Sequence, residues 1–233
     1  VGAEQQVAEV AQKVAKEKYG LDVELVTFND YVLPNEALSK GDIDVNAFQH
    51  KPYLDQQIKD RGYKLVAVGN TFVYPIAGYS KKIKSLDELQ PGSQIAVPND
   101  PTNLGRSLLL LQQVGLIKLK DGVGLLPTSL DIVENPKNLK IVELEAPQLP
   151  RSLDDAQIAL AVINTTYASQ IGLTPAKDGI FVEGKESPYV NLIVAREDNK
   201  DAENVKKFVQ AYQSDEVYEA ANKIFNGGAV KGW

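Results

Sequence analysis

The sequence contains no cysteine, no methionine and only one histidine. Without cysteine the chain can form no disulfide, no thiolate metal site and no cysteine nucleophile. A single histidine cannot supply the several nitrogen donors of a histidine metal site, and no Gly-x-Ser-x-Gly motif provides a serine nucleophile. No apolar run approaches the roughly 20 residues that a membrane-spanning helix needs.

Nucleotide and nucleic-acid binding also lack support. Neither Gly-x-Gly-x-x-Gly nor Gly-x-x-x-x-Gly-Lys-Ser/Thr occurs in the sequence. The net charge of −6 comes with no basic patch that would contact phosphates, so we expect no nucleic-acid partner. The 233 residues, 43% of them hydrophobic and 24% charged, are typical of a globular protein with one large domain or two small lobes.

Helical and strand-like patterns alternate along the first third of the chain. This alternation favours an α/β fold with a parallel sheet and crossover helices. A unit of that kind that opens on a helix is expected to have lost a strand upstream of Val1. We expect helices at 4–18, 34–39 and 52–61, and strands at 21–28, 43–48 and 64–68.

The same alternation returns after a long β-rich run at 71–79. Ser85 to Glu88 has the signature of a capping box that opens a short helix. Further strands are expected at 94–97, 139–144, 158–163 and 189–195. Further helices are expected at 102–114, 128–134, 151–155, from 165 onward, 201–212 and 215–225.

Two lobes follow from this layout. Lobe 1 would comprise residues 1–78 plus 192–233, and lobe 2 residues 79–191. The chain would cross between them near 72–80 and 189–195. A chain that leaves a lobe and returns to it is expected to form a cleft with a hinge.

The stretch from Pro98 to Arg106 is the clearest candidate for a binding site. A strand ends before it, a proline-rich turn follows, and a helix begins with Asp100 or Thr102 near its cap. Backbone N–H groups at a helix start favour an anion, and Arg106 one turn later offers a planar fork for a carboxylate. The alternative is an ordinary surface arginine on a capped helix.

Three further polar residues have two interpretations each. His50, near Phe48 and Tyr53, is either a structural residue at a strand end or part of a pocket wall. Asn164 ends an apolar strand and either caps the next helix or binds a ligand. Asn191 interrupts the apolar strand 189–195, where a buried amide needs a partner.

Several long motifs occur in order and at consistent spacing: Gly2–Gln5, Asp44–Tyr53, Pro98–Arg106, Leu144–Arg151, Ser187–Asn191, Gly227–Val230 and Trp233. Together they resemble the methionine-binding lipoproteins of the NlpA/MetQ type. This family comprises the substrate-binding components of methionine ABC importers. Two of its features, a lipid-modified N-terminal cysteine and a first strand just before Gly2, are absent from the sequence.

The resemblance implies a two-lobed periplasmic-binding-protein fold of type II, with an amino acid held in the cleft and no cofactor. Arg106 would hold the ligand carboxylate with Asn103 beside it, and Asn164 and Asn191 would bind the polar head. The thioether side chain would be enclosed by Tyr31, Phe48, His50 and Tyr53.

The family also implies partners and a location. The ligand would be L-methionine, with D-methionine as a second candidate. It would be delivered to the permease and ATPase subunits of an importer. The full-length form would be periplasmic or on the cell surface, attached to the membrane only through an N-terminal lipid that this chain lacks. An enzyme on the same bilobal fold is the main alternative, disfavoured because no nucleophile–base pair lies among the candidates. A surface-interaction protein is the other.

Overall fold

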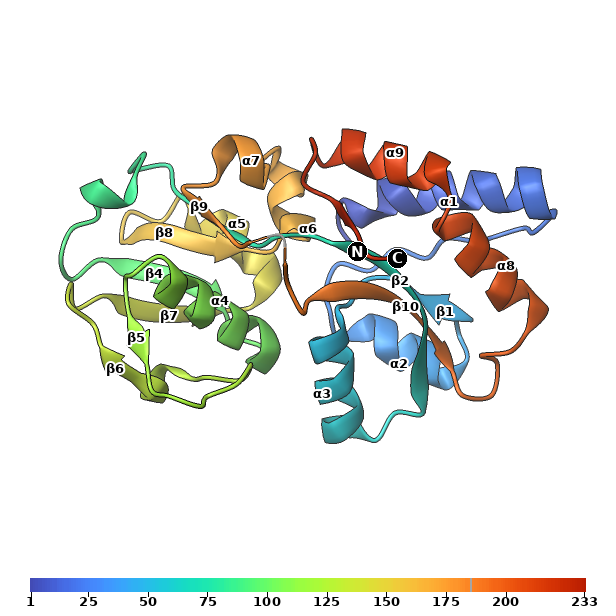
Figure 1. Ribbon diagram of the computed structural model, residues 1–233, viewed down its shortest axis with the longest axis horizontal. Coiled ribbons are helices and arrows are strands. Elements are labelled where there is room, and N and C mark those ends of the chain that lie inside the picture. Colours follow the sequence, from blue (N-terminus) through green and yellow to red (C-terminus); the bar gives the residue numbers. More distant parts are fainter. Residues whose placement is uncertain (185) are drawn as a thin grey trace. The chain divides into compact units, whose positions relative to one another are not determined.

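The computed structural model describes residues 1–184 and 186–233, which divide into two compact units (Figure 1). Unit 1 comprises Val1–Tyr74 and Lys185–Trp233, and unit 2 comprises Pro75–Gly184. The chain therefore leaves unit 1 after Tyr74 and returns to it after Gly184. The sequence places these boundaries at 78/79 and 191/192.

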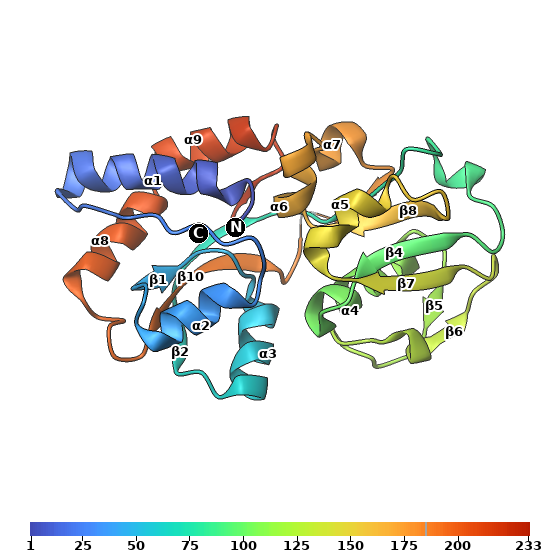
Figure 2. The same ribbon diagram turned by 180° about the vertical axis from the view of Figure 1, so that it is seen from behind.

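Unit 1 is a four-stranded sheet with helices on both faces (Figures 1 and 2). The strand order is β1-β10-β2-β11, and every neighbouring pair is antiparallel. Its strands are β1 (Val45–Asn46), β2 (Leu65–Val73), β10 (Val190–Arg196) and β11 (Val230–Lys231). Its helices are α1 (Glu4–Tyr19), α2 (Leu33–Lys40), α3 (Lys51–Arg61), α8 (Glu203–Tyr212) and α9 (Asp215–Ile224).

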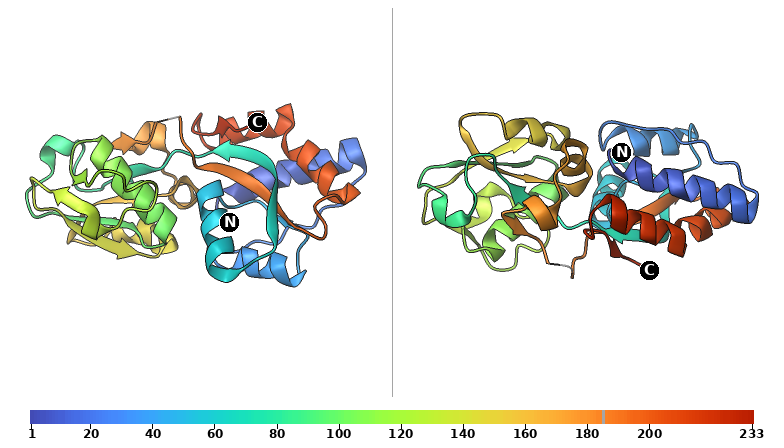
Figure 3. Two further views of the ribbon diagram at one scale, coloured as in Figure 1. Left: turned by 60° about the horizontal axis from the view of Figure 1, so that its bottom comes forward. Right: turned by 90° about the horizontal axis from the view of Figure 1, so that it is seen from above.

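Alternating residues of β10 separate two hydrophobic clusters in unit 1, as the period of two in a strand requires. Ile193 belongs to the cluster under α1, α8 and α9, whereas Leu192 and Val194 belong to the cluster with Leu38 of α2 and Leu54 of α3. The helices α1 and α9 lie side by side over the first cluster (Figure 3). Both faces of the sheet are thus covered.

Three sequence expectations for unit 1 differ from the structure. Residues 21–28 form no strand, because no described segment pairs with their backbone in a ladder. The expected parallel sheet is replaced by antiparallel pairing in the described part of unit 1, because β10 returns through this sheet and pairs with both β1 and β2. The expected strand 43–48 is reduced to Val45–Asn46.

Unit 2 is built on a five-stranded mixed sheet in the order β7-β4-β8-β3-β9. Strand β4 pairs in parallel with β7 and β8, as the alternation predicted, whereas β3 pairs antiparallel with β8 and β9. These strands are β3 (Ala77–Tyr79), β4 (Gln94–Pro98), β7 (Lys140–Leu144), β8 (Ile158–Ile163) and β9 (Phe181–Val182). A separate hairpin is formed by β5 (Lys118–Leu119) and β6 (Ile132–Glu134).

The helices of unit 2 are short apart from α4. Leu104, Leu108 and Leu111 of α4 belong to the same hydrophobic cluster as Ile95 and Val97 of β4, so this helix packs on the sheet. The α-helices are α4 (Pro101–Gln113), α5 (Leu149–Ser152), α6 (Thr165–Ala168) and α7 (Pro175–Asp178). Single 3-10 turns occur at η1 (Leu86–Glu88), η2 (Ser129–Asp131), η3 (Ala146–Gln148) and η4 (Ser169–Ile171).

The helix expected at 128–134 is wrong. Thr128 does open a helical turn, with the reciprocal side-chain hydrogen bonds of a capping box, but the turn is only η2. From Ile132 the backbone pairs with β5 instead, because a two-stranded hairpin satisfies its N–H and C=O groups. A local cap is therefore not enough to extend this turn into a helix when the residues that follow it pair in a hairpin.

Candidate functional site

The predicted strand–turn–helix at residues 98–106 is confirmed in unit 2. Asp100 is the N-cap of α4, where its side chain accepts hydrogen bonds from the backbone and side-chain nitrogens of Asn103 at 3.3 and 2.7 Å. Pro101 takes the first helical position, where a missing N–H costs nothing. Burial raises the pKa of Asp100 above its ordinary value, while these hydrogen bonds from Asn103 act in the opposite direction.

Asn103 and Asn164 meet at the carboxyl ends of β4 and β8. These strands are parallel neighbours, so the residues that follow them lie at the same edge of the sheet. The side-chain Nδ2 of Asn164 donates to Oδ1 of Asn103 at 3.4 Å, and the two side chains are almost completely buried. Asn164 begins α6 without capping it through its side chain, and its Oδ1 is buried with no hydrogen-bond partner among the described residues.

Arg106 is not a surface arginine, so that alternative is wrong. Its side chain is only 4% exposed and forms a two-point ion pair with Glu183. Nε donates to Oε2 at 2.9 Å and Nη2 donates to Oε1 at 2.7 Å. Glu183 thus binds the Nε–Nη2 edge of the guanidinium and fixes the plane of that group.

Unit 1 brings together the four aromatic residues that the family resemblance singled out. The ring centroids of Tyr31, Phe48 and Tyr53 lie 5.9 to 6.0 Å from one another. The ring of His50 lies 6.2 Å from that of Tyr53, edge to face. The hydroxyl of Tyr53 donates to the backbone oxygen of Tyr31 at 2.7 Å, which ties the loop before α2 to α3.

His50 and Asn191 are neighbours in unit 1. Their backbones form an antiparallel bridge, at the point where the register between β10 and β2 shifts. His50 is also the N-cap of α3, because its Nδ1 accepts from the backbone N–H of Tyr53 at 3.1 Å. Its ring lies 5.0 Å from that of Tyr189. His50 is therefore structural, and it also belongs to the aromatic cluster.

Three buried amides behind this cluster were not predicted as functional residues. The side chains of Asn35, Asn46 and Gln49 bond to one another at 2.8 to 3.1 Å, and Asn46 also donates to the backbone oxygen of Pro34. The network connects α2 to the segment that carries Phe48 and His50. The available signal was that the two amides Asn46 and Gln49 lie close together in the sequence. Their common partner on α2, Asn35, could not be identified from the sequence.

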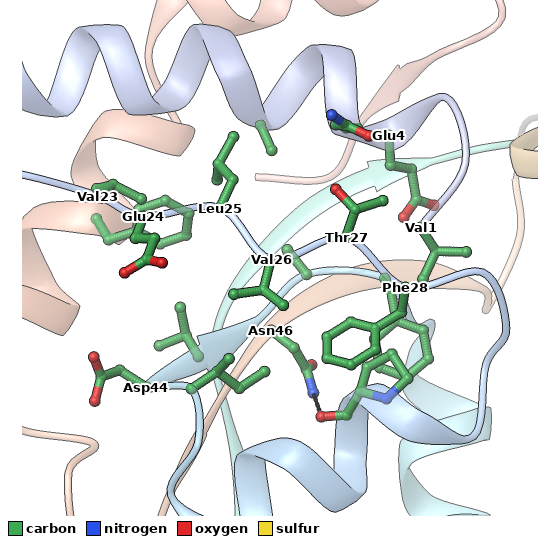
Figure 4. A pocket seen from close by; sticks show the side chains of 18 of the residues that line it. Val1, Glu4, Val23, Glu24, Leu25, Val26, Thr27, Phe28, Asp44 and Asn46 are labelled. Carbon is green, nitrogen blue, oxygen red and sulfur yellow. Dashed lines mark hydrogen bonds between the residues drawn. The ribbon is translucent and has the colours of Figure 1, made fainter.

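A pocket of about 450 Å³ lies in unit 1 (Figure 4). Residues 23–28 run along one side, and Asp44 and Asn46 lie on the other. Of the eight predicted ligand residues only Phe48 lines it. Its lining includes carboxylates, among them Glu24 and Asp44, and no Lys, Arg or His side chain. It therefore lacks the cationic side chain that would hold the carboxylate of an amino acid.

Two further properties of the described residues bear on the kind of site. No group of three or more His, Asp or Glu side chains is arranged to hold a metal ion in residues 1–184 and 186–233. In the same part of the chain, no helix has the length and apolar character to span a bilayer.

Solved structures share this fold over the whole chain. The crystal structure of a methionine-binding protein, MetQ, has a TM-score of 0.99 and 95% identity, covering 100% of this chain and 95% of that one. A periplasmic substrate-binding protein of an ABC transporter from Coxiella burnetii has a TM-score of 0.96 and 51% identity, covering 100% and 97%. A nutrient-binding protein from Burkholderia cenocepacia, bound to methionine, has a TM-score of 0.96 and 55% identity, with the same coverage. The fold is that of the substrate-binding proteins.

Sequence comparison gives the family within this class. A sequence model of the NlpA lipoproteins matches residues 1–233. The D-methionine-binding lipoprotein MetQ of Escherichia coli (strain K12) is 95% identical over 233 residues, which are 100% of this chain and 86% of that protein. The chain belongs to the NlpA lipoprotein family, which confirms the resemblance of the motifs. These relatives are named as binding proteins, so they lend no support to the alternative of an enzyme.

Proposed function

We propose that this chain binds methionine and delivers it to a membrane ABC importer. The observation that carries the proposal is the arrangement in unit 1, where the ring cluster of Tyr31, Phe48 and Tyr53 adjoins the His50–Asn191 bridge. An apolar aromatic surface beside an amide suits a zwitterion with an apolar tail. A thioether gains about 0.3–1.5 kcal/mol from contact with an aromatic ring, which favours methionine among apolar amino acids.

Unit 2 supplies the proposed partners of the ligand's carboxylate. Arg106 would bind it through its guanidinium, whose plane is set by Glu183 at Nε and Nη2. Asn103 and Asn164 would add amide hydrogen bonds, and the buried Oδ1 of Asn164 supports this because a buried acceptor needs a donor.

The importer and the membrane belong to the same proposal. Relatives named as lipoproteins and as ABC-transporter binding proteins support a periplasmic or cell-surface location, with permease and ATPase subunits as partners. A lipid on a longer, N-terminally extended form would be the membrane attachment. Both stereoisomers are candidates, since one relative is named for D-methionine.

The experiment is to identify and then titrate the ligand. Mass spectrometry of small molecules released from the purified protein is expected to find methionine. Isothermal titration of ligand-stripped protein is expected to give saturable one-to-one binding of L-methionine, with D-methionine as a parallel titration. Conversion of methionine to a product, or no heat of binding with either isomer, would contradict the proposal.

A further inference from the structure

A buried carboxylate contacts the amide that we assign to the ligand's polar head. Glu4 lies in the first turn of α1 and is only 3% exposed. Nδ2 of Asn191 donates to its Oε1 at 3.2 Å, although the two residues are 187 positions apart in the chain. Both belong to unit 1, so this contact depends on the fold of that unit alone.

A carboxylate buried at this position destabilises the folded state unless other groups interact with its charge. Removing an ionised group from water carries a large penalty, and the first turn of a helix offsets only part of it through the helix dipole. Glu4 also lies near enough to Tyr74 and Tyr212 that its negative charge contributes to the raised pKa of each phenol, for which burial is the larger cause.

The hydrogen bond with Glu4 fixes the orientation of the Asn191 side-chain amide. Oε1 of Glu4 accepts from Nδ2 of Asn191, so the carboxyl group of Glu4 contacts the nitrogen side of this amide and not Oδ1. The amide plane is then held with its nitrogen toward α1. The amide oxygen Oδ1 is then the atom of Asn191 that can contact a ligand. Because it is an acceptor, it suits an ammonium and not a carboxylate.

We propose that Glu4 is a positioning residue that orients Asn191 so that Oδ1 accepts a hydrogen bond from the ammonium of the bound amino acid. This inference rests on the proposed methionine function and adds a basis for selectivity. The amino end of the ligand would be selected by the Glu4–Asn191 pair. Carboxylic acids without an amino group would be rejected on this account.

The test compares methionine with its desamino analogue, 4-(methylsulfanyl)butanoic acid, by isothermal titration of the full chain. The wild type is expected to bind the analogue at least about tenfold more weakly, the usual effect of losing a charged hydrogen bond. Glu4→Gln is expected to weaken methionine by about tenfold and to leave the analogue within about twofold. The ratio of the dissociation constants of the two ligands would then fall toward one.

Two controls separate positioning from stability. Glu17→Gln removes one charge from an exposed residue of the same helix and is expected to leave both affinities unchanged. In an Asn191→Ala background, Glu4→Gln is expected to have little further effect on methionine, because the group that it positions is gone. Glu4→Asp keeps the charge on a shorter side chain and is expected to retain part of the discrimination, which gives a second variant should Glu4→Gln fold poorly.

The outcomes are distinguishable. Equal weakening of methionine and the analogue by Glu4→Gln, or additive effects of Glu4→Gln and Asn191→Ala, would refute the role of Glu4 while leaving methionine binding in place. Failure of the wild type to bind methionine would refute the proposed function itself, and this inference with it.

Discussion

At the scale of single residues, the ion pair between Arg106 and Glu183 has the strongest consequence. Arg106→Ala removes one partner of a buried pair, which typically costs about 3–5 kcal/mol of stability. Glu183 keeps 12% of its side chain exposed, so we expect the lower end of that range. The same variant is expected to weaken methionine binding at least about tenfold, because a charge-assisted hydrogen bond is lost.

Titration and chemical denaturation of Arg106→Ala and Arg106→Lys check this expectation. The lysine variant keeps the charge without the planar fork, so it is expected to recover some stability and little affinity. Lys81→Ala is the matched control, because its ion pair with Asp154 is exposed and exposed pairs contribute about 0–1 kcal/mol. Unchanged methionine affinity in Arg106→Ala would remove this residue from the site.

The sequence predicts local residues better than distant partners. Asp100, Asn103 and Arg106 lie in one stretch whose turn and helix chemistry can be read directly, and their placement near the start of α4 is confirmed. Glu183 and Glu4 were missed, because they reach their partners across 77 and 187 positions of chain. Such pairs depend on strand order and packing, which no local pattern contains.

At the scale of elements, His50 connects the start of α3 to the aromatic cluster. His50→Ala is expected to lower the free energy of unfolding by about 0.5–2 kcal/mol, the usual cost of losing an N-cap. His50→Asn restores a capping side chain but removes the ring, so it is expected to be nearly as stable as wild type and to bind methionine more weakly.

Thermal or chemical unfolding and titration of the two His50 variants separate these roles. Wild-type affinity in His50→Asn would show that the ring contributes nothing to binding. Wild-type stability in His50→Ala would show instead that the hydrogen bond from Tyr53 does not stabilise α3.

Elements with strong local signals were predicted well, and those that depend on partners were not. α1 is confirmed, with Gly20 at its C-cap in the left-handed conformation at φ 62°, a position that glycine adopts without strain. Residues 21–28 have a strand-like sequence but pair with no described strand, and 132–134 leave a helical turn to pair with β5. Strand formation requires a neighbour, and a single sequence does not identify that neighbour.

At the scale of the whole molecule, buried tyrosines in both units predict alkaline unfolding. Burial raises the pKa of Tyr74 and Tyr212 in unit 1 and of Tyr79 in unit 2 above the ordinary value near 10. The folded state therefore holds these phenols neutral where the unfolded state ionises them. Their contribution to stability is complete below about pH 10 and is lost as the pH rises toward the folded-state values.

Denaturant unfolding at several pH values between about 9 and 11, with ultraviolet absorbance of the phenolates, checks this expectation. The free energy of unfolding is expected to fall over that range, and the slope is expected to be smaller in Tyr79→Phe. Ionisation of all the tyrosines near pH 10 without loss of structure would contradict it.

The central claim is that this chain binds methionine and that Asn191 and Asn164 are among the residues that hold it. Isothermal titration of L-methionine into ligand-stripped wild type, Asn191→Ala from unit 1 and Asn164→Ala from unit 2 tests it most directly. We predict one site per chain in the wild type and a loss of at least about tenfold in each variant. Asn191→Ala is also expected to lower the thermal midpoint of the ligand-free protein, because it removes the hydrogen bond to the buried carboxyl of Glu4. Wild-type affinity in either variant would show that the substituted residue does not contribute to binding and would contradict the account.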